Sequence, residues 1–178
     1  MQPTIIWLTG SPCSGKTSIA EELHRELGDI SCVFDGDVIR QTISRDLKPG
    51  PQDREKNLMR VIDLINQTKD RYAVSIAAIV SPIERLRQLA KSTFETLGFN
   101  FMLVHVTASK KALIERDVKG LYKKAIDGDK SILLPGFNDI YEIPQEANVT
   151  CFTDKESLKE CVDKIKTAYL KFAKQPRV

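Results

Sequence analysis

The sequence predicts an α/β protein built on a five-stranded parallel sheet flanked by helices. Short apolar runs rich in β-branched residues alternate with helical patterns along the chain, which is the element order of a parallel sheet. The first apolar run leads into the glycine-rich octapeptide Gly10–Thr17, which fits a turn between a strand and a helix. At 178 residues and 42% hydrophobic content, the chain is long enough for one well-packed core and short for two domains. We therefore expect a single domain over residues 1–178.

The strands are expected where the apolar runs lie. Right-handed crossovers would bring the loops that follow the strands to one edge of the sheet. The expected strands are Ile5–Leu8, ending at Thr9, then Cys32–Phe34, Val74–Val80, Phe101–Val106 and Val149–Phe152.

The helices are expected between these strands, with boundary chemistry at several ends. Gly28 suits a C-terminal cap, Ser81 precedes Pro82 as a capping hydroxyl, and Thr153 with Glu156 fits a capping box. From Gly120 to Pro144 the periodicity is lost, so a mobile lid segment is expected over about 117–144. The expected helices are Lys16–Leu27, Val38–Ser44, Gln52–Asp70, Ile83–Leu97, Lys110–Arg116 and Lys155–Ala173.

The charge and cysteine patterns exclude several classes of protein. A net charge of +3, from 27 basic and 24 acidic residues spread along the chain, predicts neither a nucleic-acid nor a membrane partner. With no membrane-length apolar run and no signal-peptide pattern, a cytoplasmic location is expected, and a homodimer is compatible with the sequence. The scattered cysteines Cys13, Cys32, Cys151 and Cys161 include no C-x-x-C pair, which argues against a zinc site and a disulfide framework.

The octapeptide matches the complete phosphate-binding pattern G-x-x-x-x-G-K-[ST]. Placed between a strand and a helix, such a loop directs backbone N–H groups at a polyphosphate. Lys16 would reach the β- and γ-phosphates and Thr17 a Mg²⁺ ion, so a nucleoside triphosphate, ATP, is the expected ligand. The loop consists of Gly10, Ser11, Pro12, Cys13, Ser14, Gly15, Lys16 and Thr17.

Two carboxylates follow the second strand, in Asp35-Gly36-Asp37. Phosphoryl transfer requires a metal that bridges the phosphates and a group that deprotonates or orients the acceptor hydroxyl. We interpret Asp35 and Asp37 as serving these needs, with Asp35 also on the metal side. The alternative is a solvated Asp-Gly turn.

Further cations lie where an anionic ligand would need them. Arg40 follows the carboxylates, and Arg54, Asn57 and Arg60 recur at helical spacing, which suits either a doubly anionic ligand or a solvated helix face. A second group lies around the start of the lid segment, where cations would neutralise the transferring phosphoryl group. There we assign a function to Arg116 and Lys119 and leave Lys123 and Lys124 to the surface.

With these residues in view, the chain resembles the adenylyl-sulfate kinases, P-loop enzymes that phosphorylate the ribose 3′-hydroxyl of adenosine 5′-phosphosulfate. The resemblance runs from Ile6 to about Pro144, and its Lys-Gly-Leu-Tyr-Lys-Lys-Ala run is more distinctive than the phosphate loop. The motifs that carry it are Asp35–Arg40, Asp53–Asn57, Val80–Pro82, Arg116–Ala125 and Tyr141–Pro144.

The resemblance implies a role for each matching position. It implies Asp35 as the base for the 3′-hydroxyl, Asp37 as a substrate or metal-side contact, and Lys119 as part of the lid. It implies that Arg40, Arg54 and Asn57 hold the phosphosulfate, with Val80 beside the substrate and Ser81 at the substrate or phosphoserine position.

The departures from the family pattern concentrate at the positions that would contact the nucleotide base of the acceptor substrate. Val38 stands where the family has Asn. Pro49 and Leu134 stand where the family has the two phenylalanines that sandwich the adenine. Phe137 would replace the second phenylalanine if the register of the lid segment shifts. Another nucleotide anhydride, such as cytidine diphosphoramidate in capsule modification, is therefore the alternative substrate. A regulatory module that binds ATP without turnover is a further alternative, and the absence of an N/T-K-x-D motif disfavours a GTPase.

Overall fold

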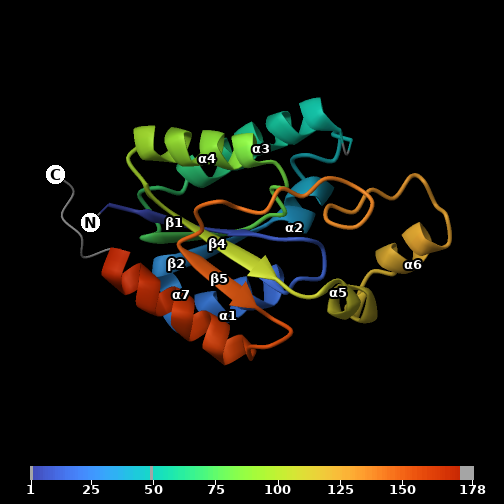
Figure 1. Ribbon diagram of the computed structural model, residues 1–178. Helices are drawn as coiled ribbons and strands as arrows, with labels where there is room; N and C mark the ends of the chain where they lie inside the picture. Colours follow the sequence, from blue (N-terminus) through green and yellow to red (C-terminus); the bar gives the residue numbers. More distant parts are fainter. Residues whose placement is uncertain (1, 49, 173–178) are drawn as a thin grey trace.

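The computed structural model describes residues 2–48 and 50–172 (Figure 1). Pro49, which the family pattern singles out, lies outside the described residues. The five expected strands are confirmed to within two residues at each end. They are β1 (Thr4–Thr9), β2 (Ser31–Asp35), β3 (Val74–Ala78), β4 (Asn100–Thr107) and β5 (Val149–Phe152).

The described strands form one parallel sheet in the order β2-β3-β1-β4-β5. Each pair of neighbouring strands is parallel, so all five carboxyl ends meet at one edge. The central strand β1 is buried along its whole length, which explains the unbroken apolar run Ile5–Leu8 within it. The strand order reverses on either side of β1, and open α/β sheets bind ligands in the crevice at such a point.

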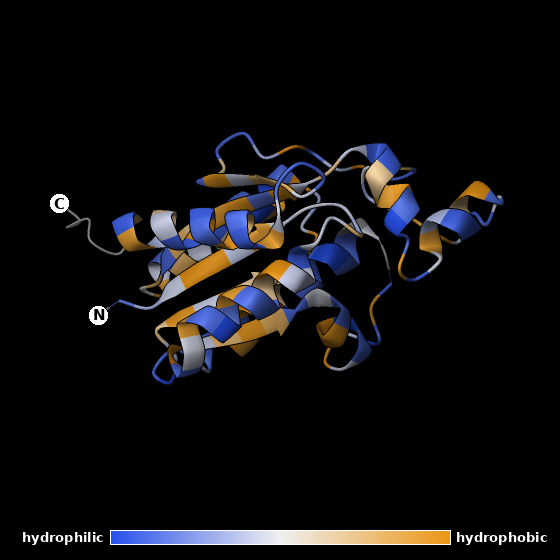
Figure 2. Ribbon diagram, turned by 90° about the horizontal axis from the view of Figure 1, so that it is seen from below, coloured by the Kyte–Doolittle hydropathy of each residue, from blue (hydrophilic) through white to orange (hydrophobic). Residues whose placement is uncertain are grey.

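The helices cover both faces of the sheet. In Figure 1, α3 (Pro51–Asn66) and α4 (Glu84–Thr96) lie on one face, and α1 (Lys16–Leu27) and α7 (Leu158–Phe172) on the other. Each pair encloses its own apolar core against the strands, which appear mainly orange between bluer outer helix surfaces in Figure 2. The shorter helices α2 (Gly36–Gln41), α5 (Lys110–Arg116) and α6 (Leu121–Ile126) lie toward the carboxyl edge.

The lid segment is more ordered than the sequence predicts. Leu121–Ile126 forms the helix α6, because Asp117 accepts hydrogen bonds from the backbone N–H groups of Tyr122 and Lys123 at its start. Tyr122 packs with Leu113 and Leu134 in a small third core. The expected irregular flap over this stretch is therefore wrong for its first part, where a short apolar face is buried.

Two of the three expected caps are wrong. Gly28 does end α1, with φ of 65°. The reciprocal capping box at α7 is made by Ser157 and Glu160, four residues after the expected pair, so the helix starts at Leu158. Ser81 makes no cap, since α4 begins at Glu84 after Ile83.

None of the helices described over residues 2–48 and 50–172 is long and apolar enough to cross a membrane.

Candidate active site

The P-loop joins the end of β1 to the first turn of α1. Gly10 packs so tightly that a Cβ there would lie 2.0 Å from the carbonyl oxygen of Val106. Gly15 has φ of 97°, which suits glycine, and Cys13 has φ of 62°, a conformation that residues with a side chain rarely adopt. Close approach and left-handed backbone therefore explain why the loop needs its two glycines.

Lys16 lies inside this loop. Its Nζ donates to the carbonyl oxygens of Gly10 and Ser11, each at 2.9 Å. Burial lowers the pKa of Lys16 to about 8, against the attraction of Asp37 and Asp35, which raises it. A phosphate bound in the loop would favour the charged ammonium, because an adjacent opposite charge stabilises it.

Thr17 and Asp35 meet beside the loop. The Thr17 hydroxyl donates to Oδ2 of Asp35 at 2.7 Å. The other carboxylate oxygen of Asp35 caps α2, accepting from the backbone N–H groups of Asp37 and Val38 at 2.8 and 3.3 Å. The cap fixes the orientation of the carboxylate, and the hydroxyl and carboxylate oxygens are hard ligands of the kind that Mg²⁺ prefers.

Asp37 and Lys119 form an ion pair between the core and the lid segment. Both side chains are more than half exposed, at 59% and 51%, so the pair contributes little to stability. It nevertheless brings the lysine of the lid to the mouth of the site.

Arg40, Arg54 and Asn57 come together on one wall. Arg54 pairs with Asp139 of the lid segment, and both side chains are largely buried, at 11% and 18% exposure. Burial and the nearby Arg54 charge lower the pKa of Arg40. Asn57 is 6% exposed, and its Oδ1 has no hydrogen-bond partner among the described residues. Two neighbouring guanidinium groups suit an anionic ligand, and the free acceptor of Asn57 suits an N–H or O–H donor on the same ligand.

Arg60 does not join this wall. It donates to both carboxylate oxygens of Asp46 and to the carbonyl oxygen of Ile43, on the outer side of α3. Its place at helical spacing after Arg54 and Asn57 therefore reflects a surface ion pair.

Val80 and Ser81 form the loop after β3. The Ser81 hydroxyl accepts a hydrogen bond from Nε1 of Trp7 at 3.0 Å, and the Val80 carbonyl oxygen accepts one from Thr9 at 2.6 Å. Ser81 has φ of 41°, a strained value for serine. Such strain at a site wall is typical of positions that the surrounding structure holds for function.

Arg116 lies at the donor end of the site. Its guanidinium donates to the carbonyl oxygen of Cys13 in the P-loop at 3.3 Å and to the hydroxyl and carbonyl oxygens of Thr153 at 2.9 and 2.7 Å. Thr153 in turn donates to the carbonyl oxygen of Ser14 at 2.9 Å. Arg116 thus connects the end of α5, the P-loop and the turn after β5.

Of the two lid residues expected to contact the base of the acceptor nucleotide, Leu134 lines the cleft and Phe137 does not. Leu134 is 2% exposed and packs with Leu113 and Tyr122, while one edge lines the cleft. Phe137 lies away from the cleft, where its ring packs edge-on against Tyr122 and beneath Nζ of Lys110. The position of Phe137 therefore gives no support to its expected stacking on a substrate base.

Sequence reasoning missed a buried cation beneath the site. Arg87 of α4 is 1% exposed and donates to the carbonyl oxygens of Ser81 at 2.7 Å and Glu142 at 2.6 Å, as well as to Glu84. It joins the loop after β3 to the end of the lid segment. The sequence could have indicated this buried arginine, because Arg87 follows Leu86 on the apolar side of an amphipathic helix, and a charged residue there needs polar partners.

These groups surround one cleft of about 1220 Å³ at the carboxyl edge of the sheet. Three loop residues, Gly10, Ser11 and Ser14, are not part of the cleft lining. The cleft thus joins a phosphate-binding loop, a carboxylate pair and a cationic wall. Its lining includes Pro12, Cys13, Gly15, Lys16, Thr17, Asp35, Asp37, Arg40, Arg54, Asn57, Val80, Ser81, Arg116, Lys119 and Leu134.

Comparison with known proteins gives consistent relatives. The adenylylsulphate kinase family model matches residues 2–152. An adenylyl-sulfate kinase of Paraburkholderia xenovorans is 36% identical over 164 residues, covering 90% of this chain and 89% of its own. One of Rippkaea orientalis is 38% identical over 168 residues, covering 92% and 90%.

Among solved structures, the Mycobacterium tuberculosis APS kinase CysC, in complex with AMPPNP and APS, superposes with a TM-score of 0.88 at 27% identity. The match covers 95% of this chain and 98% of that one.

Proposed function

The chain belongs to the adenylylsulphate kinase family, and we propose that it transfers the γ-phosphoryl group of ATP to the ribose 3′-hydroxyl of adenosine 5′-phosphosulfate. The observation that carries this proposal is the single cleft that joins the P-loop to Asp35 and to the cationic wall. A donor triphosphate in the loop would lie next to an acceptor held by the wall. In-line transfer requires this arrangement.

The donor half of the reaction falls to the P-loop. The loop N–H groups and Lys16 would bind the β- and γ-phosphates. Thr17 and Asp35, whose oxygens lie 2.7 Å apart, would hold Mg²⁺. When bound, the ion neutralises phosphate charge and orients the γ-phosphate. Arg116, beside Cys13, would contact the donor nucleotide.

The acceptor half falls to the carboxylates and the wall. Asp35 would accept the proton of the 3′-hydroxyl, with Asp37 contacting the acceptor. Arg40, Arg54 and Asn57 would hold the phosphosulfate, whose two anionic groups match two guanidinium groups. Lys119 would leave Asp37 and stabilise charge on the transferring group. Val80 and Ser81 would form the wall beside the ribose.

The lid segment, residues 117–144 of one domain, would close over both substrates. Its contacts with the core, the Lys119–Asp37 and Arg54–Asp139 ion pairs, keep it beside the cleft before substrate binds, and both pairs would be exchanged for substrate contacts on closure. Closure excludes water and so limits hydrolysis of ATP.

The part of the cleft that would contact the base of the acceptor nucleotide is compatible with a second candidate substrate. Leu134 offers an aliphatic edge to the cleft, and Phe137 lies outside it. Among the described residues, no phenylalanine lines the cleft, which would favour an anhydride with a smaller base, such as cytidine diphosphoramidate.

A coupled assay of ADP release tests both candidates, with adenosine 5′-phosphosulfate and cytidine diphosphoramidate as parallel acceptors. We expect turnover with the adenosine compound, abolished by Lys16→Ala and unchanged by Lys171→Ala, an exposed lysine on α7. Turnover with the cytidine compound alone would reassign the substrate. ATP binding without turnover of either acceptor would instead indicate a regulatory module.

The cellular location and the oligomeric state of the enzyme are also proposals. All four cysteines are free thiols, which fits the reducing cytoplasm where ATP is available. A homodimer is compatible with the structure. Light scattering during gel filtration would test it.

A further inference from the structure

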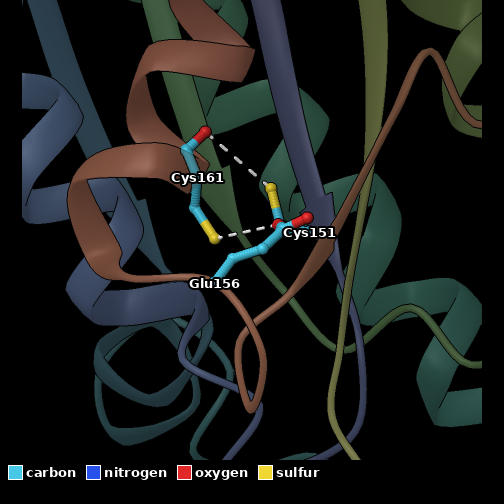
Figure 3. Close-up of side chains that lie close together, drawn as sticks. All are labelled: Cys151, Glu156 and Cys161. Atoms are coloured by element: carbon cyan, nitrogen blue, oxygen red, sulfur yellow. Dashed lines mark hydrogen bonds between the residues drawn. The ribbon is translucent and has the colours of Figure 1, made fainter.

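Two cysteines that the sequence separates meet at the turn between β5 and α7. Cys151 lies beside Cys161, and the Glu156 carboxylate lies next to both (Figure 3). Both cysteines have no exposed surface, and Glu156 is half-buried. The two sulfur atoms and one carboxylate oxygen all lie within 4.8 Å of one another. The absence of a C-x-x-C pair had argued against such a cluster, but the strand-turn-helix path closes the distance.

The spacing of these atoms is that of a tetrahedral metal site. Zinc bonds of about 2.3 Å to sulfur and about 2.0 Å to oxygen place the two ligand atoms about 3.5 Å apart. The Sγ atom of Cys161 lies 3.5 Å from Oε2 of Glu156. Two zinc-bound sulfurs would lie about 3.8 Å apart, so the Cys151 sulfur is at most about 1 Å too far from Cys161 and at most about 1.3 Å too far from the Glu156 oxygen.

The surroundings of Glu156 orient it for this role. Lys164 donates to its other oxygen, Oε1, at 2.8 Å and also to the carbonyl oxygen of Thr150 at 2.7 Å. The backbone N–H of Phe152 donates to Oε2 at 3.1 Å. Partners of this kind commonly orient a metal-binding carboxylate.

The charges also balance. Before a cation binds, the two thiols are neutral and Glu156 pairs with Lys164. Binding a divalent cation would release both thiol protons to water. The two thiolates and Glu156 then carry three negative charges, which the cation and Lys164 offset in full.

The site opens toward the cleft and differs chemically from the magnesium position. Both sulfurs are buried, so a cation would enter from the large cleft past the half-buried Glu156, and a water would complete the tetrahedral coordination. Sulfur ligands select soft and borderline cations, whereas the oxygens of Thr17 and Asp35 suit a hard one. One protein would then distinguish the two cations by ligand chemistry.

We propose that Cys151, Glu156 and Cys161 bind one thiophilic divalent cation of the zinc type. The cation would link β5 to the first turn of α7 and so stabilise the fold.

Cobalt titration of the full-length protein tests the proposal. The protein is stripped with EDTA, kept reduced, and titrated with Co²⁺, whose bonds to thiolate give a near-ultraviolet charge-transfer absorption. We expect saturation at one equivalent, displacement of cobalt by one equivalent of Zn²⁺, and a higher melting temperature with zinc. Mg²⁺ in excess should displace nothing.

The variants assign the ligands. Cys151→Ser and Cys161→Ser should lose the absorption, and Glu156→Gln should weaken cobalt binding by more than about tenfold. Cys32→Ser, a half-buried cysteine of β2, and Cys13→Ser should keep it. Circular dichroism in EDTA checks that each variant is folded, and Cys151→Ala replaces the serine variant if it is not.

The proposal fails if the reduced protein shows no thiolate absorption with cobalt. It fails equally if the absorption survives in Cys151→Ser or disappears in Cys13→Ser. A protein whose two thiols form a disulfide on storage, and which binds no cobalt after reduction, would also overturn it.

Discussion

Replacing Arg87 with methionine removes a buried guanidinium that joins three parts of the molecule. Arg87 donates to the carbonyl oxygens of Ser81 and Glu142 and pairs with Glu84 of its own helix. Methionine keeps much of the side-chain volume and removes all these donors. The carbonyl oxygen of Ser81 retains a longer hydrogen bond from Thr9, at 3.3 Å.

The size of the effect follows from those contacts. A hydrogen bond from a charged donor contributes about 1.5–3 kcal/mol, and two such bonds to carbonyl oxygens are lost. Glu84 also loses its partner, although its 21% exposure lets water replace part of that interaction. We therefore expect Arg87→Met to lower the free energy of unfolding by about 3–5 kcal/mol. For a chain of this length, the melting temperature would fall by about 10 °C.

Arg85→Met on the same helix provides the matched control. Arg85 pairs with Glu55, but its side chain is 68% exposed, so its loss should cost at most about 1 kcal/mol. Thermal melting and urea unfolding of both variants measure the difference. Steady-state kinetics measures a second effect, a lower kcat/KM in Arg87→Met, because the Ser81 loop loses its support. An Arg87→Met protein that melts within 2 °C of Arg85→Met, with wild-type kcat/KM, would refute this reasoning.

Three further predictions concern the P-loop and the lid. The pKa of about 8 for Lys16 predicts that ATP affinity, measured by calorimetry, falls as pH rises above 8, since the free lysine loses the proton that phosphate binding requires; a flat profile to pH 9.5 would contradict it. Lys119→Met should lower kcat at least tenfold in the ADP-release assay while shifting stability by less than about 1 kcal/mol, because its pair with Asp37 is exposed. Gly10→Ala should abolish ATP binding or folding, since its Cβ would meet a carbonyl oxygen at 2.0 Å, whereas Gly50→Ala, with open space around it, should bind ATP normally.

The strands and the P-loop were predictable because their signals are local. The run Ile5–Leu8 in β1 is apolar throughout, as a strand buried on both faces requires, and the loop's glycines meet steric needs within a few residues. The boundaries of α1 and α5 were correct to the residue for the same reason. The expected caps at Thr153 and Ser81 failed because each hydroxyl has a distant partner, the Ser14 carbonyl oxygen and the Trp7 indole respectively.

Partners across long sequence separations could not be predicted. Nothing near Arg54 in the chain indicates Asp139, which lies 85 residues away, and nothing near Cys151 indicates the fold of the turn that brings Cys161 to it. The burial of Leu134 likewise depends on Tyr122 of α6, a helix that the lysine-rich sequence obscures. Motif spacing therefore predicted most of the residues that the fold gathers around one cleft, and only the fold identified the partners that hold them.

The two ion pairs across the cleft suggest how the site keeps its charges in place before substrate binds. Asp37 pairs with Lys119 and Arg54 with Asp139, so in each pair one member belongs to the core and the other to the lid segment. When an anionic acceptor binds to Arg54, it would replace Asp139 as the partner of this guanidinium group. The largely buried Arg54 would then keep an anionic partner at every stage. Asp139, once released, would free its part of the lid to move. Binding of the acceptor and rearrangement of the lid would thus be coupled through the same guanidinium group, with Arg40 as the second cation that makes the exchange favourable.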